Sequence, residues 1–159
     1  MGEKRIGVAV DFSVGSRAAL QWAIDNVVRK GDHLILVTIR PEGDSEAQLW
    51  ETTGCPLIPL SELCDAQVMK KYGAKPDSET LDIVNLAATQ KEVVVVMKIF
   101  WGDPREKLCE AITNIPLDHV VIGNRGLGKL KRAIMGSVSN YVVNQSSCPV
   151  TVVKHASST

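Results

Sequence analysis

The sequence has no excess of charge of either sign, because 18 Lys and Arg residues are balanced by 18 Asp and Glu residues over 159 positions. General nucleic-acid and membrane-surface binders usually carry an excess of Lys and Arg, so the balance argues against both classes. No apolar run approaches the roughly 20 residues of a membrane-crossing helix, and the first residues have no apolar signal core. We expect a cytoplasmic protein with no membrane span and no nucleic-acid partner.

The sequence also lacks the residue pairs that are typical of disulfide, metal or catalytic sites. The four cysteines form no CxxC pair and have no metal-like spacing with the three histidines. No nucleophile is paired with a base, and no pair of carboxylates is visible, so no catalytic residue and no metal ligand is predicted. A domain of this length buries roughly 68–70% of its unfolded surface and needs neither a disulfide nor a metal. Residues 1–159 are therefore expected to form one domain.

Short apolar runs separated by helical patterns are what the chain does contain. Helices are expected after Ser13, within residues 61–90 with a break near Gly73 and Pro76, after Asp103, and from about Ser137. The strands are expected at residues 6–10, 34–39, 92–100, 118–122 and 150–153. Residues 41–60 carry several prolines and glycines, and a long loop after the second strand is expected there. This alternation predicts an α/β domain with a five-stranded parallel sheet and helices on both faces.

The carboxyl ends of the expected strands mark a candidate site. Asp11 follows the first strand, Ile39 ends the second, and Gly123 follows the fourth. In open parallel sheets, ligands bind beyond these ends, where the strand order reverses. The first strand is apolar throughout and is therefore expected near the centre of the sheet.

The segment from Gly123 to Ser139 contains four glycines and four cations, a composition typical of anion binding by backbone N–H groups. Two familiar templates fail on it. The dinucleotide pattern GxGxxG requires a glycine where Lys131 stands, and it belongs after the first strand. The P-loop pattern GxxxxGK[ST] requires a metal-binding hydroxyl where Leu130 stands.

A third spacing fits, Gly123-x2-Gly126-x9-Gly136-Ser137. Here the sequence resembles the universal stress protein family, whose ATP-binding members carry G-x2-G-x9-G-[ST] between the fourth strand and the last helix. The resemblance extends over nearly the whole chain, from the opening that ends at Asp11 to the closing segment 148–153. The stretch 101–108 resembles plant members of the family.

This resemblance implies a Rossmann-like fold of the adenine nucleotide alpha hydrolase type, with strand order 3-2-1-4-5. It also implies that Ala9, Asp11 and Ile39 line the base, that Ile122 and Gly123 approach the ribose, and that Gly126, Gly136, Ser137 and Val138 hold phosphates. The nucleotide-contact residues expected from it are Ala9, Val10, Asp11, Ile39, Ile122, Gly123, Arg125, Gly126, Gly136, Ser137, Val138 and Ser139. From the residues alone, Asp11 could instead cap the first helix, the glycines could be turn residues, and Ser137 is expected to be both helix cap and phosphate contact.

The function expected from these features is a stress-response sensor or adaptor that binds ATP or AMP, with or without Mg²⁺. Two alternatives stay open, slow ATP hydrolysis or nucleotidyl transfer on the same loop, and a chaperone-like dimeric interaction protein. The last strand, residues 150–153, is apolar and lies at a sheet edge in the implied order, where pairing with a second copy would cover it. A homodimer through this strand and an unknown protein partner are therefore also expected.

Overall fold

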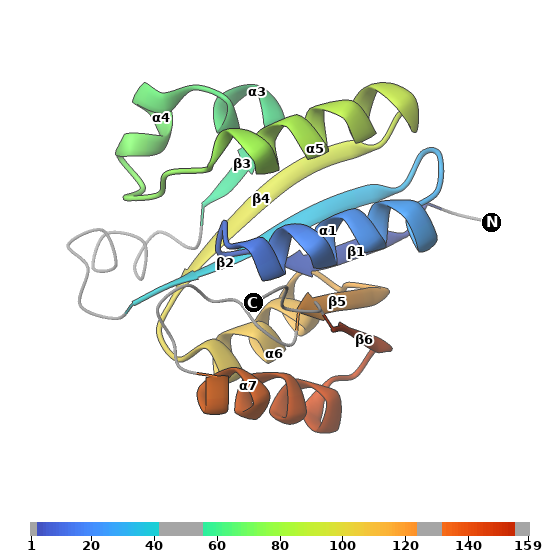
Figure 1. The fold of residues 1–159 in the computed structure, drawn as a ribbon, viewed down its shortest axis with the longest axis vertical. Coiled ribbons are helices and arrows are strands. Elements are labelled where there is room, and N and C mark those ends of the chain that lie inside the picture. Colours follow the sequence, from blue (N-terminus) through green and yellow to red (C-terminus); the bar gives the residue numbers. More distant parts are fainter. Residues whose placement is uncertain (1–2, 42–55, 124–131, 155–159) are drawn as a thin grey trace.

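The computed structural model describes residues 3–41, 56–123 and 132–154, and of residues 132–137 only the course of the backbone. Strands and helices alternate along most of this chain (Figure 1). The elements in order are β1 Arg5–Ala9, α1 Val14–Asn26, β2 His33–Arg40, β3 Leu57–Pro59, α3 Leu60–Leu63, α4 Ala66–Lys70, α5 Ser78–Gln90, β4 Val94–Trp101, α6 Pro104–Asn114, β5 His119–Gly123, α7 Arg132–Gln145 and β6 Val150–Val153.

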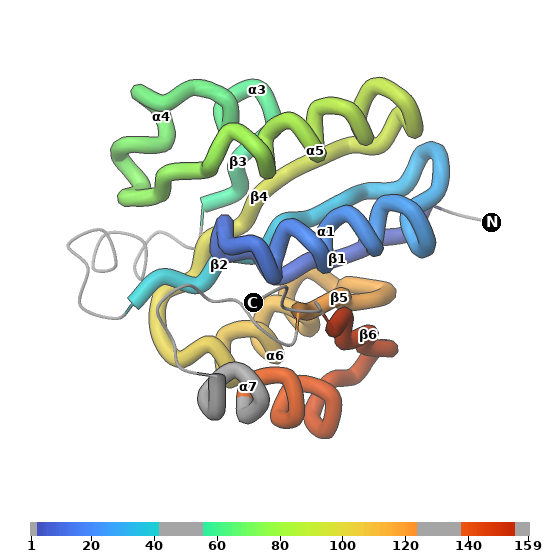
Figure 2. The backbone as a smooth tube through the Cα atoms, in the orientation of Figure 1, coloured from blue at the N-terminus to red at the C-terminus, as the bar shows by residue number. Residues whose placement is uncertain are grey.

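The described strands form a six-stranded sheet in the order β3-β4-β2-β1-β5-β6. All neighbours are parallel except β3 and β4. β1 lies between β2 and β5, and the tube in Figure 2 follows β1, β2 and β4 side by side across the molecule. The five parallel strands follow the predicted 3-2-1-4-5 order, so the fold class is confirmed, with one strand more than expected.

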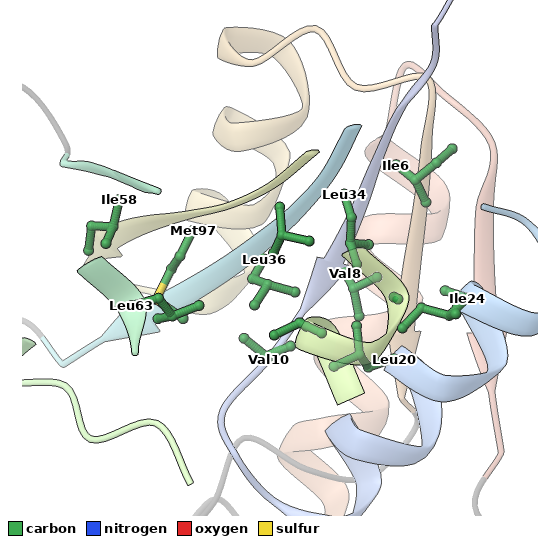
Figure 3. Packing of buried hydrophobic residues seen from close by; sticks show 14 of the residues in the cluster. Ile6, Val8, Val10, Leu20, Ile24, Leu34, Leu36, Ile58, Leu63 and Met97 are labelled. Atoms are coloured by element: carbon green, nitrogen blue, oxygen red, sulfur yellow. The ribbon is translucent and has the colours of Figure 1, made fainter. Parts of the chain in front are cut away.

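Alternating side chains of the strands fill two apolar cores, one on each side of the sheet. Ile6, Val8 and Val10 of the first strand segment pack with Leu20 and Ile24 of α1 on one side (Figure 3). Ala9 packs on the other side in a cluster that includes residues of α6 and α7. Because both faces of the sheet are covered, the central strands are apolar throughout, as is usual for buried parallel strands.

Helix starts follow the capping rules where the sequence shows them clearly. Ser13 accepts from the Ser16 backbone N–H at α1, and Asp77 accepts from the Thr80 N–H at α5. Asp103 caps α6, with Pro104 at the first helical position, as predicted.

Two local expectations are wrong. Residues 41–60 were expected to be loop throughout, but Leu57–Pro59 form β3, which pairs antiparallel with Val96–Lys98, and α3 begins at Leu60. Pro56 before the strand and Pro59 at its end suggest a loop, yet proline is tolerated on an edge strand, where its missing N–H breaks no central ladder.

The last helix was expected to start near Ser137, but α7 begins at Arg132. Gly136 and Ser137 therefore lie inside the helix and do not begin it. A glycine within a helix costs about 0.5–1 kcal/mol relative to alanine, which the rest of a 14-residue helix can offset.

Candidate functional site

The candidate site begins with a tight turn between β1 and α1. Val10 N–H donates to the Val37 carbonyl at 2.9 Å and continues the pairing of β1 with β2. Phe12 then adopts a left-handed conformation with φ of 64°, an uncommon choice for a bulky residue. The Asp11 Oδ1 atom accepts from the Ser13 N–H at 3.1 Å and from the Ser13 hydroxyl. One oxygen of the carboxylate thus holds the turn in shape.

An ion-pair cluster around Arg17 also holds this turn. The Arg17 guanidinium donates to the Phe12 carbonyl at 2.9 Å and to Asp77 Oδ2 at 2.9 Å, and its Nε lies 3.2 Å from Glu79 Oε2. Arg17 therefore links the turn after β1 to the start of α5. Sequence reasoning missed this residue, because nothing local in the sequence pairs it with positions 60 residues away.

Buried polar atoms without hydrogen-bond partners gather at the carboxyl ends of three neighbouring strands. Among the described residues these atoms include Asp11 Oδ2 after β1, Thr38 Oγ1 near the end of β2 and Trp101 Nε1 at the end of β4. Most buried polar groups in native proteins are paired, so each such atom calls for an explanation. A ligand that donates to the carboxylate would supply one at Asp11. Thr38 and Trp101 were not predicted, although their positions at strand ends could have suggested them.

A cavity of about 370 Å³ opens at this edge of the sheet. Asp11, Phe12, Thr38, Ile39 and Arg40 line one side of it, and the end of α4 with the segment after it lines the other. The lining residues from that second side are Lys70, Gly73, Ala74 and Lys75. The cavity thus joins two predicted site residues, Asp11 and Ile39, to a cationic wall that sequence reasoning did not foresee. Its size falls within the range of small-molecule sites.

The remaining apolar site residues belong to the cores beneath this edge. Ala9, Ile122 and Val138 are almost wholly buried in the cluster on the α6 and α7 side, and Ile39 packs against that cluster. Val10 packs on the opposite side. Apart from Ile39, none of these residues belongs to the described lining of the cavity, and their side chains are largely occupied by core packing.

Gly123 ends β5 and is buried. Extending the register of Val8 with Val121 by two residues sets Gly123 beside Val10, at the same edge as Asp11. Ser139 lies in α7 and is buried. Gly136 and Ser137 belong to α7, and only the course of their backbone is described. Arg125 and Gly126 fall outside the described residues. The structure thus brings together the strand-end half of the predicted site.

Within the described ranges, no three His, Cys, Asp or Glu side chains gather closely enough to hold a metal ion. The helices of the same part of the chain are all too short or too polar to cross a membrane.

The fold and this edge define the chain as a Rossmann-like α/β protein with its candidate site at the reversal of strand order. The profile of the universal stress protein family matches residues 3–154. The chain belongs to the universal stress protein family. Universal stress protein PHOS34 of Arabidopsis thaliana is 33% identical to it over 166 residues, which cover 96% of this chain and 62% of that protein. The chain thus spans less than two thirds of that relative's length.

Solved structures show the same fold. Universal stress protein UspA from Lactobacillus plantarum has a TM-score of 0.64 and 23% identity, covering 96% of this chain and 99% of its own. A universal stress protein family protein from Arabidopsis thaliana, solved with AMP bound, has a TM-score of 0.59 and 19% identity, covering 97% of this chain and 93% of its own.

Proposed function

We propose that this protein binds an adenine nucleotide, ATP or AMP, at the carboxyl edge of its sheet and acts in the cytoplasm as a stress-response sensor or adaptor. The observation that carries the proposal is the buried Asp11 Oδ2, to which the described residues offer no hydrogen-bond partner, at the point where the strand order reverses. A structural neighbour of the same family holds AMP.

In this proposal Asp11 accepts a hydrogen bond from a ribose hydroxyl or from the adenine amino group, as acidic residues do in other doubly wound folds. Ala9, Val10 and Ile39 form the wall beside the base, and Ile122 and Gly123 approach the ribose. The phosphates lie at the segment of Gly126, Gly136, Ser137, Val138 and Ser139, with Arg125 nearby. Because Gly136 to Ser139 lie inside α7, their backbone N–H groups are used by the helix, and in this proposal the Ser137 hydroxyl is the donor there. Magnesium would add charge neutralisation at the phosphates.

The expected affinity is micromolar, which corresponds to about 8 kcal/mol. Each hydrogen bond that involves a charged group contributes roughly 1.5–3 kcal/mol, so three such bonds with burial of the base reach that value. Titration calorimetry with ATP and with AMP measures it directly.

Asp11→Asn is the sharpest variant for this test. The amide oxygen can still accept from Ser13, while the amide N–H₂ group replaces the unpaired oxygen with a donor. We expect nucleotide affinity to fall about 10- to 150-fold, equivalent to the roughly 1.5–3 kcal/mol of one hydrogen bond to a charged group.

Asp82→Asn, an exposed carboxylate of α5 that lines none of these surfaces, is the matched control and should bind as the unsubstituted protein does. Equal affinities of Asp11→Asn and Asp82→Asn, with both proteins folded, would remove Asp11 from the site.

The proposal includes a homodimer. β6 is at one edge of the described sheet, and its four residues Val150–Val153 are half-exposed. An apolar edge strand with unpaired backbone N–H and C=O groups tends to pair with other chains unless it is covered. Pairing of β6 with β6 of a second copy would cover this edge strand in both subunits. The carboxyl ends of the strands in each sheet would stay accessible to nucleotide and to a protein partner.

A further inference from the structure

A second cavity, of about 400 Å³, lies beside the first under the short helices α3 and α4. Its apolar lining comes from Leu63, Met69, Pro76 and Leu81. Leu63 and Met69 are almost wholly buried, and Figure 3 shows Leu63 against Met97 of β4. Two of the side chains that line this cavity therefore belong to the hydrophobic core. It is of a size that small-molecule sites commonly have.

Two cations lie at the wall that this cavity shares with the first one. Lys70 and Lys75 line both cavities, together with Ala74. Neither lysine appears in an ion pair among the described residues. No carboxylate belongs to the described lining of the second cavity.

Three acidic side chains near the second cavity have partners elsewhere. Asp77 and Glu79, which follow Pro76, pair with Arg17. Asp65 caps α4 by accepting from the Gln67 N–H at 3.0 Å. The described lining of the cavity itself thus carries two cations and no carboxylate, although the whole chain is neutral.

We propose that this second cavity binds a small amphipathic carboxylate, with its apolar body among Leu63, Met69 and Leu81 and its carboxylate at Lys70 and Lys75. The apolar floor favours a hydrocarbon or aromatic body through burial of surface. The two lysines favour an anionic head over a cationic or neutral one. This binding does not depend on the nucleotide, so the two proposals fail or stand separately.

Decanoate serves as the probe, with decan-1-ol and decyltrimethylammonium as neutral and cationic probes of the same chain length. Titration followed by amide NMR should show saturable binding of decanoate, with shifts centred on residues 63–76, and weaker binding of the other two. The variants are Lys70→Gln and Lys75→Gln, and the matched control is Lys71→Gln. Lys71 is exposed, stacks on the Tyr72 ring at 5.2 Å and lines neither cavity.

Each lining variant should weaken decanoate binding about two- to fivefold, the range of exposed ion pairs, and Lys71→Gln should leave it unchanged. Equal binding of the three probes, or equal effects of all three lysine variants, would overturn the anionic assignment. Absence of saturable binding would overturn the site.

Cys64 provides an independent readout, because this exposed free cysteine is one of the residues that line the cavity. Decanoate should slow alkylation of Cys64, measured peptide by peptide by mass spectrometry, and should leave Cys148 unaffected. Ala66→Phe places a bulky side chain from an exposed lining position into the cavity and should abolish both binding and protection. Unchanged alkylation of Cys64 at saturating decanoate would contradict the proposal, and thermal melting of Ala66→Phe confirms that it is folded.

Discussion

At the scale of single residues, the two oxygens of the Asp11 carboxylate have different roles. Oδ1 holds Ser13 and thereby the turn into α1, while Oδ2 is buried without a described partner. Phe12 in its left-handed conformation makes this arrangement possible by turning the chain sharply. The position of Asp11 after the first strand was enough to predict a site residue. The unpaired oxygen could not be predicted, because it depends on packing from other elements.

Arg17 should be the main support of this turn. Arg17→Met removes the donors to Phe12, Asp77 and Glu79, and we expect the free energy of unfolding to fall by about 1–2 kcal/mol. The estimate sits at the low end for charged hydrogen bonds because Glu79 is 73% exposed and screened by water. Urea denaturation measures it.

Lys30→Met is the control for Arg17→Met, since it breaks the exposed pair with Glu92, whose side chains are 77% and 63% exposed. That change should cost at most about 1 kcal/mol. Equal losses in the two variants would contradict a special role for Arg17.

His119 should make stability depend on pH. Burial, and next the nearby positive charge of Lys4, lower the pKa of His119 in the folded protein, while its Nε2 lies 2.7 Å from the Thr151 hydroxyl. The unfolded chain therefore takes up the proton more readily. The contribution of neutral His119 to the free energy of unfolding is fully present above the ordinary histidine pKa of about 6.5. It is lost as the pH falls from there through the lowered pKa of His119 in the folded protein.

Comparing unfolding free energies at neutral and mildly acidic pH for the unsubstituted protein and His119→Asn isolates this effect. The difference between the two proteins should shift in favour of His119→Asn as the pH falls. The hydrogen bond with Arg105 is the main cause that lowers the pKa of Asp103 below its ordinary value of 3.8. Protonation of Asp103 therefore affects stability only at pH values below 3.8, outside the range in which His119 titrates. A pH-independent difference would contradict the assignment to His119.

At the scale of elements, the sequence was informative where one element supplies its own signal. The last strand was predicted with the bounds observed, and α6 begins at the predicted cap. β3 was missed because its three residues become a strand only through pairing with β4, a tertiary contact that no local pattern records. The start of α7 was misplaced because a glycine and a serine were interpreted as a helix boundary, although α7 continues through both.

β6 should carry the dimer. Pro149 accepts from Val120 N–H at 3.0 Å, so by the alternation of a parallel ladder residues 149, 151 and 153 face β5, while Val150 and Val152 direct their backbone groups outward. Val152→Pro removes an outward donor without breaking the ladder to β5. It should weaken dimerisation about 5- to 150-fold, since a two-fold interface loses two bonds of about 0.5–1.5 kcal/mol each.

Light scattering at several concentrations measures the dimer, and Val152→Thr, which keeps the backbone donor, should remain dimeric. A monomer in the unsubstituted protein, or a dimer unaffected by Val152→Pro, would place any interface elsewhere.

At the scale of the whole molecule, the candidate site is assembled where separate segments meet. The ends of β1, β2 and β5 were predictable, because apolar runs indicate parallel strands and a first strand that is apolar throughout belongs near the centre of the sheet. The strand order itself came from the family resemblance. The end of α4 and the segment after it, which close the cavity with Lys70 and Lys75, were not predictable, because their approach to Asp11 depends on how α3, α4 and α5 pack together.

The central claim is that the base of an adenine nucleotide lies at the carboxyl edge, against the cavity lined by Asp11 and Ile39. Photolabelling with 8-azido-ATP, followed by peptide mapping, tests it most directly. We predict that label appears in peptides containing Thr38–Arg40 or Gly73–Lys75 and disappears when unlabelled ATP or AMP competes. Label at the opposite edge, around Lys4, Lys30 or Asp118, or label that excess nucleotide does not displace, would contradict it.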